Sequence, residues 1–214
     1  ALDANCNCNG TPTGCMEETI VLTFTLDAFG GQTTWELRTA PGNSVVATGG
    51  PYADGTPGTV ITETICVPAA CYRFGVHDAN GDGMGQGGYV VSDGQGNRII
   101  DANGEFGALS YMGTRFCLPV GPVQLMPASC DRTDLTLNDQ LVTTTVAGAT
   151  AYQFAFFDPH GSYQEVFTRV ENMIGPAPNA DFPLGLPVNV RVRANVSGTW
   201  TPYGPACRLT VSTI

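Results

Sequence analysis

Short runs in which apolar and polar residues alternate recur along the chain. In residues 20–26 the even positions are apolar, and threonine occupies two of the odd ones. Trp35 and Leu37 alternate with charged residues, and residues 72–77 repeat the pattern. A period of two is typical of a strand that has one face in the core and one in solvent. The pattern therefore predicts an all-β protein with antiparallel sheets.

The alternation stops at residues 119–122, Pro-Val-Gly-Pro, and then starts again. Two prolines so close together interrupt strand pairing and form a short, stiff joint. Each half carries enough strands to bury its own core. We therefore expect a Cys-rich N-terminal segment over residues 1–18, a β-sandwich over residues 19–119 and a second β-sandwich over residues 120–214.

Eight cysteines indicate an oxidising compartment, so we expect an extracellular protein whose signal peptide was removed before Ala1. Their spacing offers no two CxxC pairs, and only two histidines are present to complete a zinc site. The six cysteines of the first part allow fifteen pairings. The preferred pairs are Cys130 with Cys207, Cys15 with Cys117 and Cys66 with Cys71, which leaves Cys6 and Cys8 to pair within the N-terminal segment or with another chain.

The net charge is −10, and all nine basic residues are arginine. Nothing resembles the basic stripe that nucleic-acid binding needs, and no apolar run is long enough to cross a membrane. Charged residues make up 13% of the chain, about half of the usual ~25%. A surface with so few charges suits glycan cover or contact with neighbouring subunits.

The sharpest local motif is Asp78-Ala79-Asn80-Gly81-Asp82-Gly83-Met84. Oxygen side chains at Asp78, Asn80 and Asp82, followed by glycine, match the first half of an EF-hand loop, and the Met84 carbonyl can add a fourth Ca²⁺ ligand. Position 12 holds Tyr89 instead of the bidentate glutamate. Such a loop predicts a calcium Kd of about 10⁻⁴–10⁻³ M; the alternative is a metal-free Asn-Gly/Asp-Gly turn. The candidates for a further acid are Asp54, Asp93, Asp101 and Glu105.

No catalytic set is visible. His77 falls on the outward phase of its strand and His160 lies in a turn, and no GxSxG-type elbow accompanies either. The acids gather in turns, so we expect no enzyme. Asn9 and Asn195 stand in glycosylation sequons. Three tyrosines in turn-like segments are candidates for carbohydrate contact, namely Tyr52, Tyr163 and Tyr203.

Motifs in both halves resemble secreted proteins of gliding bacteria that export through the type IX system. In the first half these motifs are Trp35-Glu36-Leu37, Cys66, Cys71-Tyr72, residues 78–83, Gly88-Tyr89 and Phe116-Cys117. In the second half, which resembles a fibronectin type III-like module, they are Cys130, residues 137–139, 148–152, 190–194 and 198–200, and residues 203–207. The resemblance implies an exported, non-catalytic module that is adhesive or attached to a hydrolase.

Two functions fit these observations. One is the subunit of an extracellular filament or surface layer, which binds copies of itself through the N-terminal segment. A leader added as a strand to a neighbouring subunit propagates into fibres, because such contacts do not close. The other is a secreted adhesin or carbohydrate-binding pair that contacts surface glycans through its loops.

Overall fold

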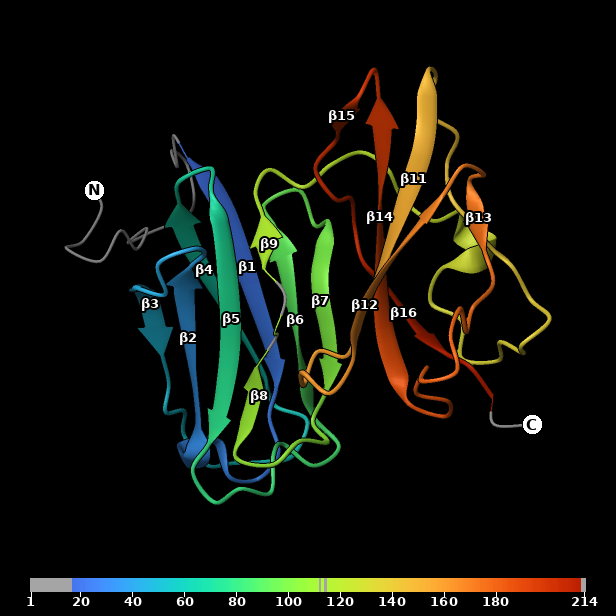
Figure 1. Ribbon diagram of the computed structural model, residues 1–214. Coiled ribbons are helices and arrows are strands. Elements are labelled where there is room, and N and C mark those ends of the chain that lie inside the picture. The colour runs from blue at the N-terminus through green and yellow to red at the C-terminus, as the bar shows by residue number, and fades with distance from the viewer. Residues whose placement is uncertain (1–16, 112, 114, 213–214) are drawn as a thin grey trace. The chain divides into compact units, whose positions relative to one another are not determined.

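The chain folds into two compact units, Ala1–Pro119 and Val120–Ile214. The computed structural model describes residues 17–111, 113 and 115–212. Within these residues the secondary structure consists of β-strands and two short 3-10 helices (Figure 1). The hydrogen-bonded strand pairs are all antiparallel. The predicted all-β class is therefore confirmed.

Unit 1 contains two sheets. The first has the strand order β4-β1-β6-β7, and the second has the order β3-β2-β5-β8 with β9 also paired to β5. The first sheet consists of β1 (Glu18–Thr25), β4 (Val60–Val67), β6 (Gly88–Asp93) and β7 (Arg98–Asn103). The second consists of β2 (Thr33–Thr39), β3 (Val45–Gly49), β5 (Cys71–Asp78), β8 (Leu109–Tyr111) and β9 (Phe116–Cys117), and the helix η1 (Gly30–Gln32) precedes β2.

The core of unit 1 lies between these sheets. The even positions of β1, from Ile20 to Phe24, are fully buried as the alternation predicts. Phe74 of β5 and Tyr89 of β6 meet across the two layers with ring centroids 5.6 Å apart. The Tyr89 hydroxyl also shares a 2.7 Å hydrogen bond with the hydroxyl of Ser110 on β8. Each large apolar side chain buried in this way stabilises the fold by about 1.5–3 kcal/mol.

Unit 2 is built on one larger sheet with the order β12-β11-β14-β15, in which β16 also pairs with β14. The strands β10 and β13 form a separate pair. Side chains of both sheets, such as Phe154 and Val190 of the larger one and Leu141 and Ile174 of the pair, fill one core. The elements are η2 (Pro127–Ser129), β10 (Leu141–Val142), β11 (Ala149–Phe157), β12 (Gln164–Arg169), β13 (Met173–Ile174), β14 (Pro187–Val196), β15 (Thr199–Trp200) and β16 (Cys207–Thr210).

Arginine and aromatic side chains stack on one another in unit 2. The Arg193 guanidinium lies 5.1 Å from the Trp200 ring and 4.6 Å from the Tyr203 ring. The Arg191 guanidinium lies 4.7 Å from the same Tyr203 ring and 5.3 Å from the Phe157 ring. Burial lowers the pKa of Arg191 to about 10. Contact of the cations with ring faces offsets part of the desolvation cost, and holds the segment after β15 against β14.

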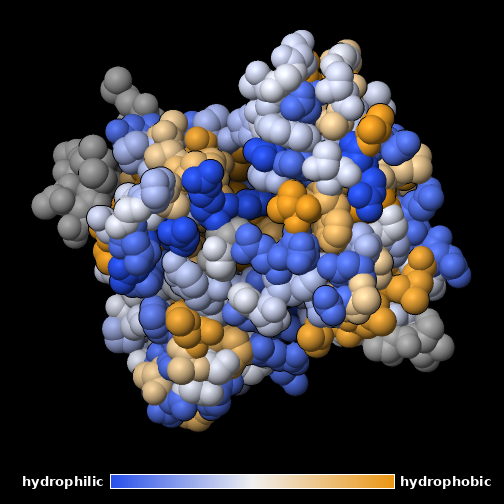
Figure 2. Space-filling model, viewed as in Figure 1, coloured by the Kyte–Doolittle hydropathy of each residue, from blue (hydrophilic) through white to orange (hydrophobic). Residues whose placement is uncertain are grey.

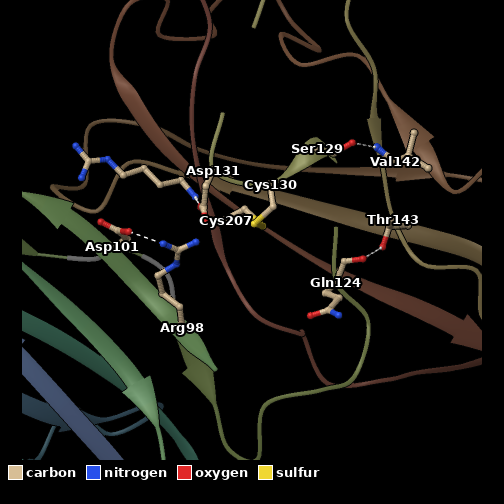
Figure 3. The surroundings of a disulfide bond; sticks show 10 residues. Arg98, Asp101, Gln124, Ser129, Cys130, Asp131, Val142, Thr143 and Cys207 are labelled. Carbon is tan, nitrogen blue, oxygen red and sulfur yellow. Dashed lines mark hydrogen bonds and ion pairs between the residues drawn. A yellow bond between two sulfur atoms is a disulfide. The ribbon is translucent and has the colours of Figure 1, made fainter. Parts of the chain in front are cut away.

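The predicted disulfide between Cys130 and Cys207 is present (Figure 3). It joins the residue after η2 to the first residue of β16 and closes a loop of 77 residues. Asp131 beside it has φ +56° and accepts a 3.0 Å hydrogen bond at Oδ1 from the Arg208 amide. In the chain-entropy account, a loop of this length stabilises the folded state by about 4.5 kcal/mol.

The pairings predicted for the first half are wrong for Cys117 and Cys71. These two cysteines are bonded to each other, not to Cys15 and Cys66. The reason is strand register, because β9 pairs with β5 so that Cys117 stands directly opposite Cys71. The prediction paired Cys15 with Cys117 because these residues lie near the two ends of the unit in the sequence. Strand register cannot be seen from such positions. Cys66 is disulfide-bonded as well; Cys6, Cys8 and Cys15 lie outside the described residues.

Apolar residues are scattered over the surface in small separate groups, as the visible face in Figure 2 shows. The more exposed large apolar side chains include Val60 of β4, at 60% exposure, and Val170 just after β12, at 74%. None of the helices in the described residues has the length and hydropathy of a membrane span.

Candidate functional site

A groove lies on the outward face of the β3-β2-β5 part of unit 1. On β2, Trp35 and Leu37 point into the core, so Thr34 and Glu36 between them face outward. The ladder register places His77 of β5 opposite Thr34, and Thr48 of β3 opposite Glu36. Alternation within each strand and register between strands thus gather these polar side chains on one surface.

The groove has a volume of about 750 Å³ and is open to solvent along the sheet. One wall is the end of β3 with the turn that follows it, and the other is formed by η1 and the chain around the end of β5. The lining residues are Gly31, Gln32, Thr34, Trp35, Glu36, Thr48, Gly49, Gly50, Pro51, His77, Asp78, Ala79 and Ala108.

The carboxylate of Glu36 is held in place within the groove by Arg38. Arg38 Nε and Nη2 donate hydrogen bonds of 2.6 and 2.7 Å to its two oxygens. These bonds hold the pKa of Glu36 below its ordinary value of 4.5. His77 Nε2 lies 3.7 Å from Glu36 Oε1, with 44% of its side chain exposed. The three residues therefore present an anchored carboxylate acceptor beside the imidazole of His77.

Two glycines shape the wall beside β3. A Cβ at Gly49 would lie 2.4 Å from Trp35 Nε1, so the indole can occupy its place only because no side chain is present. Gly50 has φ +77° and precedes a cis peptide bond to Pro51. A positive φ of this kind is readily adopted only by glycine. The sequence reasoning did not single out these glycines, although the Gly49-Gly50-Pro51 run marks a turn.

A chain of hydrogen bonds supports the groove from below. Trp35 Nε1 donates a 2.9 Å bond to the Tyr52 hydroxyl, which donates a 2.6 Å bond to Glu63 Oε1. Burial is the main cause that raises the pKa of Tyr52, and the adjacent Glu63 adds to it. Trp35 belongs to one sheet and Glu63 to the other, so Tyr52 links the two sheets through the loop after β3.

Gln32 brings an unsatisfied polar atom to the groove. Its Oε1 is buried and has no hydrogen-bond partner among the described residues. A buried acceptor in this state costs about 1–3 kcal/mol. Gln32 also belongs to the lining of the groove. No sequence motif marks Gln32. The residue ends η1, directly before β2, and lines the groove together with Thr34 and Glu36 of that strand.

The predicted calcium loop begins at the end of the groove, where β5 ends. Asp78 is buried, and its Oδ1 accepts backbone hydrogen bonds from Gly81 at 2.6 Å and Asp82 at 3.1 Å. Asn80 and Asp82 are exposed, and the Met84 carbonyl accepts a 2.8 Å bond from the Gly87 amide. The four predicted ligand residues thus lie in one turn, and one carboxylate oxygen of Asp78 already accepts hydrogen bonds from backbone amides of that turn.

The further acids predicted for this site have other contacts. Asp54 accepts a 2.7 Å hydrogen bond from the Gly31 amide, and Asp93 accepts bonds from the Gln95 and Asn97 amides of its own turn. Asp101 forms a 2.7 Å ion pair with Arg98, seen in Figure 3. Glu105 Oε2 accepts a 3.5 Å hydrogen bond from the Asn103 side-chain nitrogen, and the Glu105 backbone amide donates a 3.3 Å bond to Asn103 Oδ1.

Among the described residues, one group of three or more His, Cys, Asp or Glu side chains lies close enough to share a metal ion. It consists of Cys130, Asp131 and Cys207. Both sulfurs belong to the disulfide, so neither can act as a thiolate ligand. This cluster is therefore part of the framework of unit 2.

The other predicted residues lie apart from the groove. His160 stands in a turn, where its amide donates a 2.9 Å bond to Asp158 Oδ1. Asn195 is half-buried on β14, and its backbone and side-chain oxygens each lie 3.4 Å from the Thr150 hydroxyl. Asn9 lies outside the described residues.

The three tyrosines proposed for carbohydrate contact are half-buried and occupied within the protein. Tyr52 belongs to the bond chain under the groove. Tyr163 packs edge-on against Phe182 with centroids 5.6 Å apart, and Tyr203 stacks with two arginines. The groove instead has Tyr111 nearby, whose ring would meet a Cβ at Gly75, next to the Glu36 side chain.

Comparisons with known proteins give little beyond this description. No family model and no curated protein match the sequence. Among solved structures, the chain is similar to the FN1–FN3 domains of chicken CNTN1, with 11% sequence identity and a TM-score of 0.30. The match covers 92% of this chain and 63% of that chain, so the chain spans less than two thirds of the neighbour's length. The resemblance to type IX-exported modules stays a prediction.

Proposed function

We propose that the protein is a non-catalytic extracellular adhesion module whose unit 1 groove binds a neutral, hydroxyl-rich ligand of the kind that surface glycans present. The observation that carries this proposal is the groove itself, in which Gln32, Thr34, Glu36, Thr48 and His77 offer donors and acceptors side by side. Sugar hydroxyls both donate and accept hydrogen bonds, so they suit such a mixed surface.

The charge distribution favours a neutral glycan over an anionic one. The chain has a net charge of −10, and the groove carries the Glu36 carboxylate. A polyanion would meet repulsion from both the whole protein and the groove. Arg38 is a cation close to the groove, and its Nε and Nη2 already donate to the two carboxylate oxygens of Glu36.

The state of the carboxylates supports a binding role over glycoside hydrolysis. Hydrolysis of a glycosidic bond ordinarily uses two carboxyl groups, one of which has a raised pKa and acts as an acid. The pKa of Glu36 is instead lowered by Arg38, and Asp78 at the groove's end caps backbone amides. The disulfides agree with an extracellular location.

Binding of immobilised neutral polysaccharides tests the proposal directly. Cellulose, chitin, mannan and β-1,3-glucan are offered to the wild-type protein and to the variants Glu36→Gln, Thr34→Val and Gln32→Ala. We expect binding of at least one polysaccharide and at least tenfold weaker binding by each variant. Glu171→Gln, an exposed change in unit 2, is the matched control and should bind normally. Failure of the wild-type protein to bind any of the four, or equal binding by all variants, refutes the proposal.

A second candidate is a subunit of a surface filament or layer that is assembled through the N-terminal segment. The favouring observation is the edge strand β12, which pairs only with β11 within the described residues and carries exposed Val166. Open strand edges of this kind favour association between chains. Negative-stain electron microscopy of the protein, with and without residues 1–18, tests this function. Fibres or sheets that disappear on deletion support it, and dispersed particles in both samples reject it.

A further inference from the structure

Strand β12 (Gln164–Arg169) forms one edge of the larger sheet of unit 2. Its six residues all pair with β11 on one side. On the other side, no strand of the described residues pairs with it. An antiparallel ladder leaves every second residue of an edge strand with its N–H and C=O directed outward. The strand therefore presents a row of backbone donors and acceptors to solvent.

The side chains of β12 do little to protect this edge. Gln164, Glu165 and Thr168 are exposed, and Val166 is 46% exposed. Val170, the residue after the strand, is 74% exposed. Monomeric β-proteins usually block such an edge with proline, a bulge, a covering segment or charged side chains, and the charged residues of β12 are two of opposite sign. The ladder between β12 and β11 runs through its six pairs with no break in register.

The two charges of β12 have opposite signs and cannot neutralise each other. Glu165 and Arg169 are four residues apart on the same face of the strand, which separates their Cα atoms by about 13 Å. Within the part of the chain that the structure describes, neither side chain forms an ion pair. Arg169 lies along its own strand, where Nη1 donates a 3.0 Å bond to the Thr168 carbonyl and the guanidinium lies 5.8 Å from the Phe167 ring.

An antiparallel copy of the same strand would satisfy both charges. When two β12 strands pair about a two-fold axis at Phe167, Glu165 of each copy stands opposite Arg169 of the other. The same register places Val166 opposite Thr168. Directly opposite residues share a face of the sheet and lie about 4.5–5.5 Å apart at Cβ, so two ion pairs form on one face.

The charges also select this register over its neighbours. Moving the axis to Thr168 would place Glu165 opposite Glu171, and two like charges in direct opposition are unfavourable. Moving the axis to Val166 would place Glu165 opposite Phe167 and leave both ion pairs unmade. The charge pattern of β12 is complementary to its own reversed sequence, because Glu165 and Arg169 lie at equal distances from Phe167 and have opposite signs. Such a strand is suited to an isologous contact, in which one patch binds its own copy.

We infer that β12 is a homodimerisation edge, at which two copies of this chain pair antiparallel about Phe167 and join their unit 2 sheets into one. The inference is independent of the glycan groove, which lies in unit 1. A two-fold contact is closed, so β12 accounts for a dimer, and a filament would need a second, different contact.

Charge reversal tests the inference through the oligomeric state. Sedimentation velocity of the whole chain from 1 to 500 μM, at 50 and 500 mM NaCl, should show a wild-type dimer that weakens with salt. Glu165→Arg places arginine opposite Arg169 twice, and Arg169→Glu places glutamate opposite Glu165 twice. Each variant alone should dimerise at least tenfold more weakly than the wild-type protein. Glu171→Gln is the control and should dimerise as the wild-type protein does.

Mixing the two charge-reversal variants provides the decisive arm, because it also shows that both are folded. One strand then carries two arginines and its partner two glutamates, so the mixture regains both ion pairs. We expect a heterodimer in the mixture at concentrations where each variant alone is monomeric. A monomeric wild-type protein at 500 μM, a dimer that is insensitive to both reversals, or a mixture that stays monomeric would each overturn the inference.

Discussion

The Tyr52 hydroxyl joins the two sheets of unit 1, because it accepts from Trp35 and donates to Glu63. Tyr52→Phe would leave the indole N–H and the carboxylate without this partner in a half-buried place. We expect a loss of about 1–3 kcal/mol in the free energy of unfolding, measured by urea titration. Tyr111→Phe, on the outer face of the same unit, is the matched control and should change stability by less than about 0.5 kcal/mol. Equal effects of the two changes would contradict this role.

Glu36 gives unit 1 a defined response to acid. Its folded-state pKa is lowered, first by the hydrogen bonds from Arg38. A carboxyl with a lowered pKa stabilises the folded state above its ordinary pKa of 4.5, and this contribution disappears as the pH falls through the lower folded value. The difference in unfolding free energy between wild type and Glu36→Gln should be largest above pH 5 and shrink toward pH 3. A difference that grows in acid would contradict the assignment.

The loop from Asp78 to Met84 has two interpretations, a calcium-binding loop and a metal-free Asn-Gly/Asp-Gly turn. Gly81 and Gly83 have φ values of +82° and +75°, as an Asn-Gly/Asp-Gly turn requires. Asp78 fixes this turn through backbone amides, whereas the Asp82 side chain is exposed and free to act on an ion. The turn and the calcium site are therefore compatible, and the calcium site stays a proposal.

Calcium titration of the whole chain separates the two interpretations. We expect a Kd of about 10⁻⁴–10⁻³ M by isothermal titration calorimetry and a higher Tm in 10 mM CaCl₂. Asp82→Ala should abolish both effects and leave the calcium-free Tm almost unchanged, because Asp78 and not Asp82 caps the turn. Glu171→Gln should bind calcium as the wild-type protein does. No heat and no Tm shift in the wild-type protein would leave the metal-free turn as the answer.

The strands could be predicted because burial leaves a direct trace in the sequence. The alternation in residues 20–26 and around Trp35 placed the same side chains in the core that the structure buries. Contacts between strands leave no such trace. The Cys71–Cys117 bond and the meeting of Glu36 with His77 and Thr48 depend on register, which one sequence does not reveal. For this reason the sequence does not predict the groove, although it contains recognisable motifs at Glu36 and His77 separately.

At the scale of the whole molecule, the position of the Cys130–Cys207 bond determines how unit 2 responds to tension. An adhesin or filament subunit is pulled along its chain, and within unit 2 the force passes from residue 130 to residue 207 through a covalent link. The 77-residue segment between them is therefore shielded, which hides about 270 Å of contour length at ~3.5 Å per residue. Single-molecule stretching should show this extension only after reduction, so that the oxidised unit acts as a nearly inextensible tether.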